Sequence, residues 1–148
     1  MNSAEIKKFQ KDQLDEINRY RAIHQAPPLV LDEKLTEYSQ KWANHLAKTG
    51  KLAHQPDQKY GENVAAGSPW KSLNPAKLWY SEAPKANYSN LESSMNCLHF
   101  TQLVWWNSKK LGLGVAVSAS GMGFVVANFD PPGNVRGQFG ANVSPPKK

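Results

Sequence analysis

The stretch that decides the fold reads Leu98-His99-Phe100-Thr101-Gln102-Leu103-Val104-Trp105. Its residues favour a helix over about 95–106, and His99 is a polar ring inside this apolar segment. The period then changes from helical to alternating, because residues 111–117 place an apolar side chain at every second position. A turn leads to a second apolar run at 124–129, so the two runs predict a β-hairpin.

The other face of the first predicted strand carries only small residues. They are Gly112, Gly114, Ala116 and Ser118. Small side chains along a whole face indicate that another element packs very close to it. We therefore expect a helix to lie against this strand.

Three further helices are expected before the hairpin. Residues 3–24 place apolar side chains at helical spacing, with charged residues on the other faces. A second helix spans Asp32 to Gly50, because Asp is a good N-cap and Gly is common just past a helix end. A third, short helix opens at Asn74-Pro75 and runs through Glu82, since proline suits the first helical position.

The segments between these elements are rich in Gly, Pro, Asn and Ser. We expect residues 51–73 to be mostly loop, residues 85–94 to be irregular, and the tail to Lys148 to be loop-like. Helices that cover a small antiparallel sheet make an α+β fold. Because no linker divides residues 1–148, we expect a single domain.

Composition narrows the class of protein. The sequence has 148 residues and one cysteine, Cys97, which excludes an internal disulfide, an iron–sulfur cluster and multi-cysteine zinc or CxxC sites. The first residues lack the apolar core of a signal peptide, and no stretch approaches the roughly 20 apolar residues of a membrane span. We therefore expect an intracellular protein of a reducing compartment, or an extracellular one if the sequence lacks a native signal peptide.

The formal net charge of +6 raises affinity for any polyanion, including lipid headgroups. The basic residues are spread along the chain, with pairs at Lys7-Lys8, Lys109-Lys110 and Lys147-Lys148. We interpret most of them as solvated surface. No nucleic-acid module organises them, so no nucleic-acid partner is expected.

Four polar residues are candidates for chemistry: His54, Glu62, Glu82 and His99. An unsatisfied buried polar group costs about 1–3 kcal/mol, so a buried side chain among them must be hydrogen-bonded or coordinated. Two imidazoles favour zinc or copper, and the glutamates could accept hydrogen bonds from the ring N–H groups. Spacing alone does not establish a metal site, because the sequence has no HExxH motif.

The remaining candidates are interpreted as structural. His24 and His45 have no partner at a metal-binding spacing and are expected at the surface or partly packed. Cys97 and His99 would point about 200° apart on a helix and cannot form a nucleophilic pair, so Cys97 is expected to be buried and inert. We expect the tryptophans in the core or the cavity wall; they are Trp70, Trp79, Trp105 and Trp106.

Taken together, these motifs resemble the CAP superfamily, named for cysteine-rich secretory proteins, antigen 5 and pathogenesis-related proteins of class one. Three blocks carry the resemblance in order and rough spacing: His54…Gly61-Glu62-Asn63, Trp79-Tyr80-Ser81-Glu82, and the run from His99 to Trp105. Asn18-Arg19-Tyr20-Arg21 and the following Pro27-Pro28-Leu29 are similar to the family's first helix and turn. The resemblance covers nearly the whole chain.

Within the superfamily, the chain is most similar to the cysteine-poor, Golgi-associated branch of animal cells. The similar segments are Phe124-Val125-Val126-Ala127, Gly133-Asn134-Val135 and Pro145-Pro146-Lys147-Lys148. Ala127-Asn128-Phe129 replaces the usual cysteine and Asn-Tyr, as expected where disulfides are lost. Asn2 excludes the N-myristoylation typical of that branch, so any membrane anchoring would fall mainly to the basic charge.

The resemblance implies a three-layer α-β-α sandwich with a central cavity. It assigns His54, Glu62, Glu82 and His99 to a cavity tetrad, with His54 and His99 as weak zinc ligands. It also implies binding of anionic phospholipid or sterol, peripheral association with Golgi or other membranes, homodimers, and regulation of a protein partner in autophagy or immunity.

Two functions remain open at this stage. The favoured one is a non-enzymatic binding protein, because two histidines leave about two zinc positions to water or carboxylate. The alternative is a zinc-dependent peptidase or esterase in which Glu62 or Glu82 acts as general base on a zinc-bound water.

Overall fold

A four-stranded sheet lies between helices in the computed structural model, which describes residues 2–57, 59–93 and 95–147. The strands are β1 (Val30–Leu31), β2 (Gly61–Gly67), β3 (Lys110–Val117) and β4 (Gly123–Asp130), in the order β1-β3-β4-β2. β1 runs parallel to β3, and the β3–β4 and β4–β2 pairs are antiparallel. The predicted hairpin is formed by β3 and β4, and it lies at the centre of the sheet.

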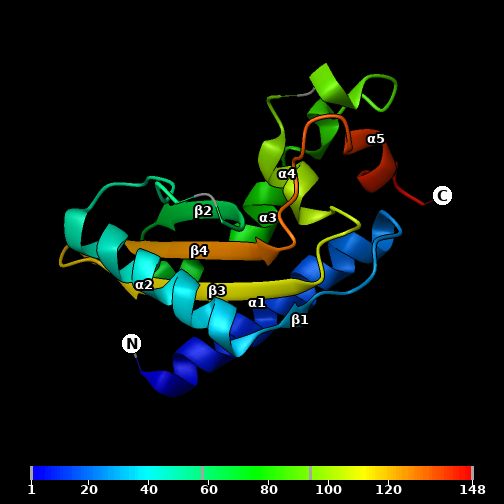
Figure 1. Cartoon of the computed structure of the whole chain (residues 1–148). Helices are drawn as coiled ribbons and strands as arrows, with labels where there is room; N and C mark the ends of the chain where they lie inside the picture. The colour runs from blue at the N-terminus through cyan, green and yellow to red at the C-terminus, as the bar shows by residue number, and fades with distance from the viewer. Residues whose placement is uncertain (1, 58, 94, 148) are drawn as a thin grey trace.

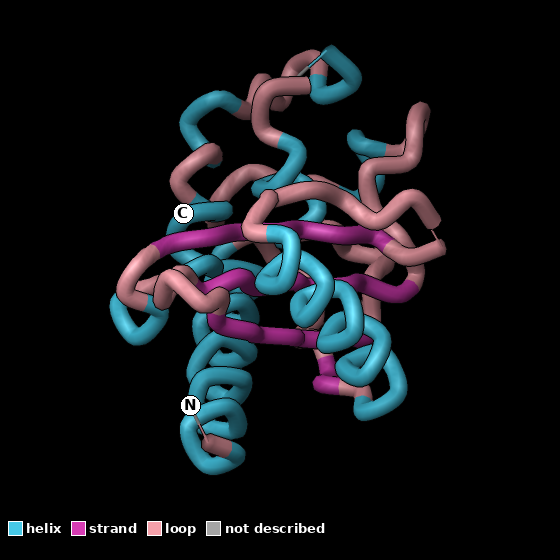
Figure 2. Tube along the Cα trace, turned by 90° about the vertical axis from the view of Figure 1, so that its left-hand side faces the viewer, coloured by secondary structure: helices cyan, strands magenta, loops and turns pink. Residues whose placement is uncertain are grey.

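Helices cover both faces of this sheet. They are α1 (Ser3–Ile23), α2 (Glu33–Thr49), α3 (Pro75–Tyr80), α4 (Leu98–Leu103) and α5 (Phe139–Asn142). In Figure 1, α2 crosses in front of β3 and β4, and α1 lies behind the sheet. Figure 2, turned by 90°, shows the strands between the helical layers. The predicted three-layer α-β-α sandwich is confirmed.

The two long helices begin and end where their sequence signals predict. The side chain of Asn2 accepts the N–H of Glu5, which starts α1. Asp32 accepts the N–H of Leu35 at the start of α2, and Gly50 closes that helix at a φ of 72°. Among the described residues, no helix combines the length and the apolar character needed to cross a membrane.

The small-residue face of β3 packs directly against α2, as expected. A Cβ at Gly112 would collide with the backbone carbonyl of Leu35, and one at Gly114 would lie 2.6 Å from the backbone N of Gln40. Larger residues at these positions would push the helix off the sheet. The glycines therefore set how closely α2 approaches the strands.

Side chains cover the part of the β3 edge that the two-residue β1 leaves open. The amide of Gln40 donates to the carbonyl of Val115 at 2.8 Å and accepts its N–H at 3.1 Å. Gln10 donates to the carbonyl of Leu113 at 2.9 Å. These contacts satisfy backbone groups that would otherwise invite pairing with another chain.

Several predicted boundaries were wrong. Residues 61–67, expected in a loop, form β2, and residues 139–142 of the tail form α5. The third helix ends at Tyr80 instead of Glu82. β2 combines small and polar residues with glycine at both ends, so its strand conformation comes from pairing along β4 and not from intrinsic propensity.

The helix around His99 is shorter than predicted at both ends, and a buried cation binds the backbone carbonyls at and after its C-terminal end. α4 spans Leu98–Leu103 instead of 95–106. The guanidinium of Arg21, which is fully buried, donates to the carbonyls of Leu103, Trp105 and Ser108 at 2.8–3.1 Å. Burial lowers the pKa of Arg21 to about 10. Arg21 thus fixes the turn that follows α4 and, with it, the position of the site helix.

Candidate functional site

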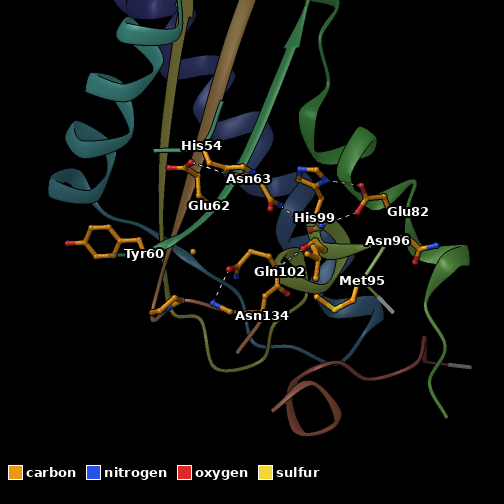
Figure 3. A pocket seen from close by; sticks show the side chains of 14 residues that line it. His54, Tyr60, Glu62, Asn63, Glu82, Met95, Asn96, His99, Gln102 and Asn134 are labelled. Atoms are coloured by element: carbon orange, nitrogen blue, oxygen red, sulfur yellow. Dashed lines mark hydrogen bonds and ion pairs between the residues drawn. The ribbon is translucent and has the colours of Figure 1, made fainter. Parts of the chain in front are cut away.

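One cavity of about 620 Å³ is lined by all four candidate residues, His54, Glu62, Glu82 and His99. Figure 3 shows His54 with Glu62 and His99 with Glu82 as two separate pairs, with Asn63 between them in this view. The four residues lie between positions 54 and 99 of the chain, and the fold brings them together in one cavity.

Four different elements supply these side chains. His54 lies in the loop after α2, and Glu62 is the second residue of β2. Glu82 directly follows the last turn of α3, and His99 lies in the first turn of α4. Each pair therefore joins two elements, and the cavity opens between the β2 edge of the sheet and α4.

In the first pair, the carboxylate of Glu62 binds the ring of His54 at Nδ1. Glu62 Oε1 lies 3.0 Å from Nδ1 of His54 and also accepts the backbone N–H of Gln55 at 2.9 Å. Glu62 Oε2 accepts from the side-chain amides of Gln55 at 3.2 Å and Asn128 at 3.1 Å. The carboxylate has donors on both oxygens and is fixed in place.

In the second pair, Glu82 holds both the ring and the backbone of His99. Glu82 Oε2 lies 2.8 Å from Nδ1 of His99, while Oε1 accepts the backbone N–H groups of His99 at 3.0 Å and Phe100 at 3.2 Å. Cys97, the N-cap residue of α4, makes no side-chain cap. Glu82 thus supplies the acceptor that the start of this helix needs.

Both carboxylates are less exposed than the imidazoles they hold. The side chains of Glu62 and His54 are 5% and 51% exposed, and those of Glu82 and His99 are 22% and 36% exposed. The carboxylates accept from the Nδ1–H groups, which leaves Nε2 as the unprotonated nitrogen of each neutral ring. Neither Nε2 atom bonds to another part of the described chain.

The contact between His54 and Glu62 shifts the pKa values of both side chains. The hydrogen bond to Glu62 raises the pKa of His54, against an opposing effect of burial. Burial by itself would raise the pKa of Glu62, but hydrogen bonds from His54, Gln55 and Asn128 together outweigh it and lower that pKa. The Glu62 carboxyl is therefore held in its charged, accepting form.

Two imidazoles line the cavity, and imidazole nitrogen is a common ligand of divalent metal ions. No group of three or more His, Cys, Asp or Glu residues is arranged to hold a metal within residues 2–57, 59–93 and 95–147. Nδ1 of each cavity histidine is engaged by a carboxylate, which is the usual outer-shell arrangement behind a metal-binding imidazole. His54 and His99 would offer their Nε2 atoms, and Glu62 and Glu82 would orient them.

Several residues that shape the cavity were not recognised as site residues from the sequence. Its wall also contains Tyr60, Asn63, Asn96, Gln102 and Asn134. Asn63 donates to the carbonyl of His99 at 3.0 Å and so links β2 to α4. These amides carry no spacing signal of their own, although Asn63 and Gln102 lie inside the two motifs already identified.

The other candidates lie outside the cavity. His24 is buried instead of partly packed, since its ring bonds to the carbonyl of Ser144 at 2.8 Å and to the hydroxyl of Tyr80 at 2.9 Å. His45 is exposed on α2. Cys97 is buried, as predicted, and desolvation raises the pKa of its thiol.

One tryptophan departs from the expectation of burial. Trp79 and Trp105 are buried, but Trp106 is 46% exposed. Trp106 lies past the end of α4, and its backbone N–H donates to the carbonyl of Asn142 in α5 at 3.0 Å. The Nζ atom of Lys109 lies 4.3 Å from the centre of the exposed ring.

Comparison with known sequences gives matches over most of the chain. The model of the CAP, or cysteine-rich secretory protein, family matches residues 14–129. The human Golgi-associated plant pathogenesis-related protein 1 is 38% identical over 158 residues, covering 100% of both chains. Pathogenesis-related protein 1A of Nicotiana tabacum is 34% identical over 142 residues, covering 93% of this chain and 83% of its own.

Solved structures share the same architecture. The crystal structure of NaASP2 with Zn²⁺ matches with a TM-score of 0.71 and 22% identity, over 93% of this chain and 85% of that one. The structure of BmVAL-1 matches with a TM-score of 0.70 and 24% identity, over 86% of this chain and 79% of that one. At these identities the likeness shows the fold alone.

Proposed function

The chain belongs to the CAP family, and from that membership we propose that it is a binding protein with a two-histidine zinc site in its cavity. One observation carries the proposal. Each cavity imidazole is held at Nδ1 by a less exposed carboxylate, which leaves its Nε2 without a protein partner among the described residues. This arrangement prepares two nitrogen ligands on separate elements.

Zinc held by His54 and His99 would act as a Lewis acid with about two open positions for a ligand that enters the cavity. Two protein ligands suit weak, exchangeable binding better than structural support. A solved CAP-like fold was obtained with Zn²⁺, which supports zinc as the metal to test.

A binding role is favoured over hydrolysis because of what the two glutamates already do. Glu62 accepts four hydrogen bonds, from His54, Gln55 and Asn128, and Glu82 accepts three, from His99 and Phe100. A general base must reach a water or a substrate proton with a free lone pair. The four bonds to Glu62 use all of the roughly four acceptor sites of a carboxylate, and the three to Glu82 leave about one. A zinc-dependent peptidase or esterase is therefore the second choice, with Glu82 as its better candidate base.

Isothermal titration with zinc tests this proposal. His54→Ala and His99→Ala should each weaken zinc binding by at least about tenfold. His45→Ala removes an exposed histidine outside the cavity and should leave zinc affinity unchanged. Equal zinc affinity in the wild type and in both cavity variants would refute the assignment.

A surface beside β1 favours a second role, peripheral binding to anionic membranes. We call it the Trp106 patch; it consists of Val30, Trp106, Lys109 and Lys110. Val30 is 67% exposed, its N–H donates to the carbonyl of Lys109, and it pairs with Lys110 across the sheet. An exposed indole with the Lys109 ammonium over its ring, next in sequence to the exposed Lys110, suits the headgroup region. There the amphipathic ring lies at the interface and cations meet lipid phosphates.

Liposome flotation separates the lipid classes for this second role. The wild type should float with vesicles containing phosphatidic acid or phosphoinositide and remain unbound with phosphatidylcholine alone. Lys109→Glu/Lys110→Glu should abolish flotation, while the matched charge change Lys34→Glu/Lys41→Glu on α2 should reduce it less. Binding that follows sterol content instead of anionic lipid would assign the surface to sterol, and equal binding to neutral vesicles would exclude electrostatic attachment.

The relatives suggest where such a protein acts. The human relative is named as Golgi-associated, and others are named as pathogenesis-related proteins. We therefore propose peripheral association with Golgi or other membranes, together with a homodimer and a regulated protein partner as further interactions. Fluorescence microscopy of the tagged chain beside a Golgi marker tests the location.

A further inference from the structure

A row of three residues runs straight across the sheet from its centre to the cavity. Gly112 in β3 pairs with Asn128 in β4, and Asn128 pairs with Glu62 in β2. Residues directly opposite each other in neighbouring strands share one face of a sheet. Here it is the face that α2 covers, because a Cβ at Gly112 would meet Leu35 and Ser39 of that helix.

The buried amide of Asn128 forms the middle of this row. Its Nδ2 donates to Glu62 Oε2 at 3.1 Å and to the carbonyl of Gly61 at 3.2 Å. The carbonyl of Gly61 and the ionised carboxylate of Glu62 can only accept hydrogen bonds. The NH₂ group of Asn128 must therefore point toward them, which fixes the orientation of the amide. Its Oδ1 therefore faces α2.

Ser39 of α2 binds the other end of the Asn128 amide. Its hydroxyl lies 2.8 Å from Asn128 Oδ1 and 3.0 Å from the carbonyl of Leu35, and it is buried. It reaches Asn128 only because residue 112 is glycine, since a Cβ there would lie 2.7 Å from Ser39 Oγ. The small-residue face of β3 therefore makes room for a hydrogen bond toward the cavity.

We propose that Ser39 and Asn128, which we call the Ser39–Asn128 bridge, are positioning residues for the cavity histidine His54. The bridge holds Glu62 Oε2 and so directs Glu62 Oε1 toward the ring, 3.0 Å from Nδ1 of His54. That contact selects the tautomer with the proton on Nδ1 and leaves Nε2 free for a metal. That these residues serve metal binding rests on the proposed zinc function, whereas the contacts from Ser39 to His54 do not depend on it.

The second pair provides an internal comparison within the same cavity. Glu82 is fixed by the backbone of α4 at His99 and Phe100, and among the described residues it forms no hydrogen bond with Ser39 or Asn128. Loss of the bridge should therefore change His54 and leave His99 as it is. A general loss of structure would change both rings.

The test is the tautomer state of each imidazole, read from ¹⁵N chemical shifts of the folded, metal-free protein in alkaline solution, where imidazole rings are neutral. Asn128→Ala and Ser39→Ala should shift His54 away from the Nδ1–H form and leave His99 unchanged. Asn128→Asp, nearly the same shape but lacking a donor, should shift His54 at least as far as Asn128→Ala. Asn142→Ala is the matched control, because Asn142 is a buried amide bonded to Asn107 and Gln138 instead.

Zinc titration gives the second measurement. Loss of the bridge should weaken zinc binding by about 10–100-fold, the usual effect of removing an outer-shell partner, and Asn142→Ala should not. If the wild type binds no zinc, the zinc proposal fails while the ¹⁵N shifts still decide the bridge. The bridge is overturned if His54 keeps its tautomer in folded Asn128→Ala and Ser39→Ala, or if Asn142→Ala changes His54 equally. If Asn128→Ala does not fold, Ser39→Ala alone decides, since it removes one hydroxyl and leaves the strand pairing intact.

Discussion

Glu82 binds His99 twice: one carboxylate oxygen lies 2.8 Å from Nδ1 of the ring, and the other accepts the backbone N–H of the same residue at 3.0 Å. One side chain therefore both starts α4 and orients the imidazole that α4 presents to the cavity. Fold stability and site geometry depend on the same carboxylate at this point. Glu62 differs, because it is held from the sheet side by Asn128.

Replacing Glu82 should therefore affect stability and metal binding together. Glu82→Ala leaves two backbone N–H groups of α4 without their acceptor, and we expect a loss of about 1–3 kcal/mol in the free energy of unfolding. Zinc affinity should fall as well, which a titration of the folded variant measures. Glu92→Ala is the control: Glu92 accepts the N–H groups of Gly137 and Phe139, so this variant should lose stability and keep zinc affinity.

Arg21 is expected to be the most sensitive charged residue. Its buried guanidinium donates to four backbone carbonyls, those of Pro27, Leu103, Trp105 and Ser108. Arg21→Met keeps much of the volume but leaves these acceptors unpaired, and urea denaturation should show a loss of about 3–5 kcal/mol. The exposed Arg19→Met should cost less than about 1 kcal/mol. Similar values for the two variants would contradict the structural role of Arg21.

Stability should also depend on pH through His24. Burial lowers the pKa of His24 in the folded protein, so the unfolded chain takes up this proton at higher pH. The contribution is therefore fully present above the unfolded pKa of about 6.5 and is lost as pH falls from there toward the lowered folded value. The free energy of unfolding should change less between pH 7.5 and pH 5 in His24→Gln than in the wild type.

His54 gives the opposite sign and serves as the comparison. Its pKa is raised, so its contribution is present at low pH and is lost as pH rises through the raised folded value. His54→Gln should steepen the loss of stability on acidification, whereas His24→Gln should reduce it. The same direction of change in both variants would contradict the assignment.

Gln40 should keep the protein from pairing through its open sheet edge. Its amide occupies both backbone groups of Val115 on β3. Gln40→Ala exposes these groups, and analytical ultracentrifugation should show new or stronger concentration-dependent association. Glu37→Ala, on the exposed face of the same helix, should sediment as the wild type does. An unchanged sedimentation profile for Gln40→Ala would mean that other side chains suffice.

Local signals in the sequence predicted the parts of the fold that local interactions determine. Asp32 and Gly50 mark the ends of α2 because capping depends on neighbouring backbone groups. The hairpin followed from alternation, and the glycines of β3 indicated the close helix. Residues 61–67 could not be identified as a strand, because their conformation depends on pairing with β4, about sixty residues later in the chain.

The same distinction applies to the site. His54, Glu62, Glu82 and His99 were candidates from their residue types, and the family resemblance then implied that they share one cavity. Asn128 gave no such signal, since its role arises from a cross-strand register and from a serine on another layer. The motifs identified the histidines and their glutamates, whereas the residues that hold Glu62 in turn, Asn128 and Ser39, required the three-dimensional structure.

Zinc X-ray absorption spectroscopy on the protein loaded with one equivalent of zinc shows directly whether His54 and His99 bind the metal. The two-histidine assignment predicts two imidazole nitrogens at about 2.0–2.1 Å, oxygen in the remaining positions and no sulfur. The imidazole count should fall from two to one in His54→Ala and in His99→Ala. A zinc shell that is unchanged in both variants, or one that contains the sulfur of Cys97, would contradict it.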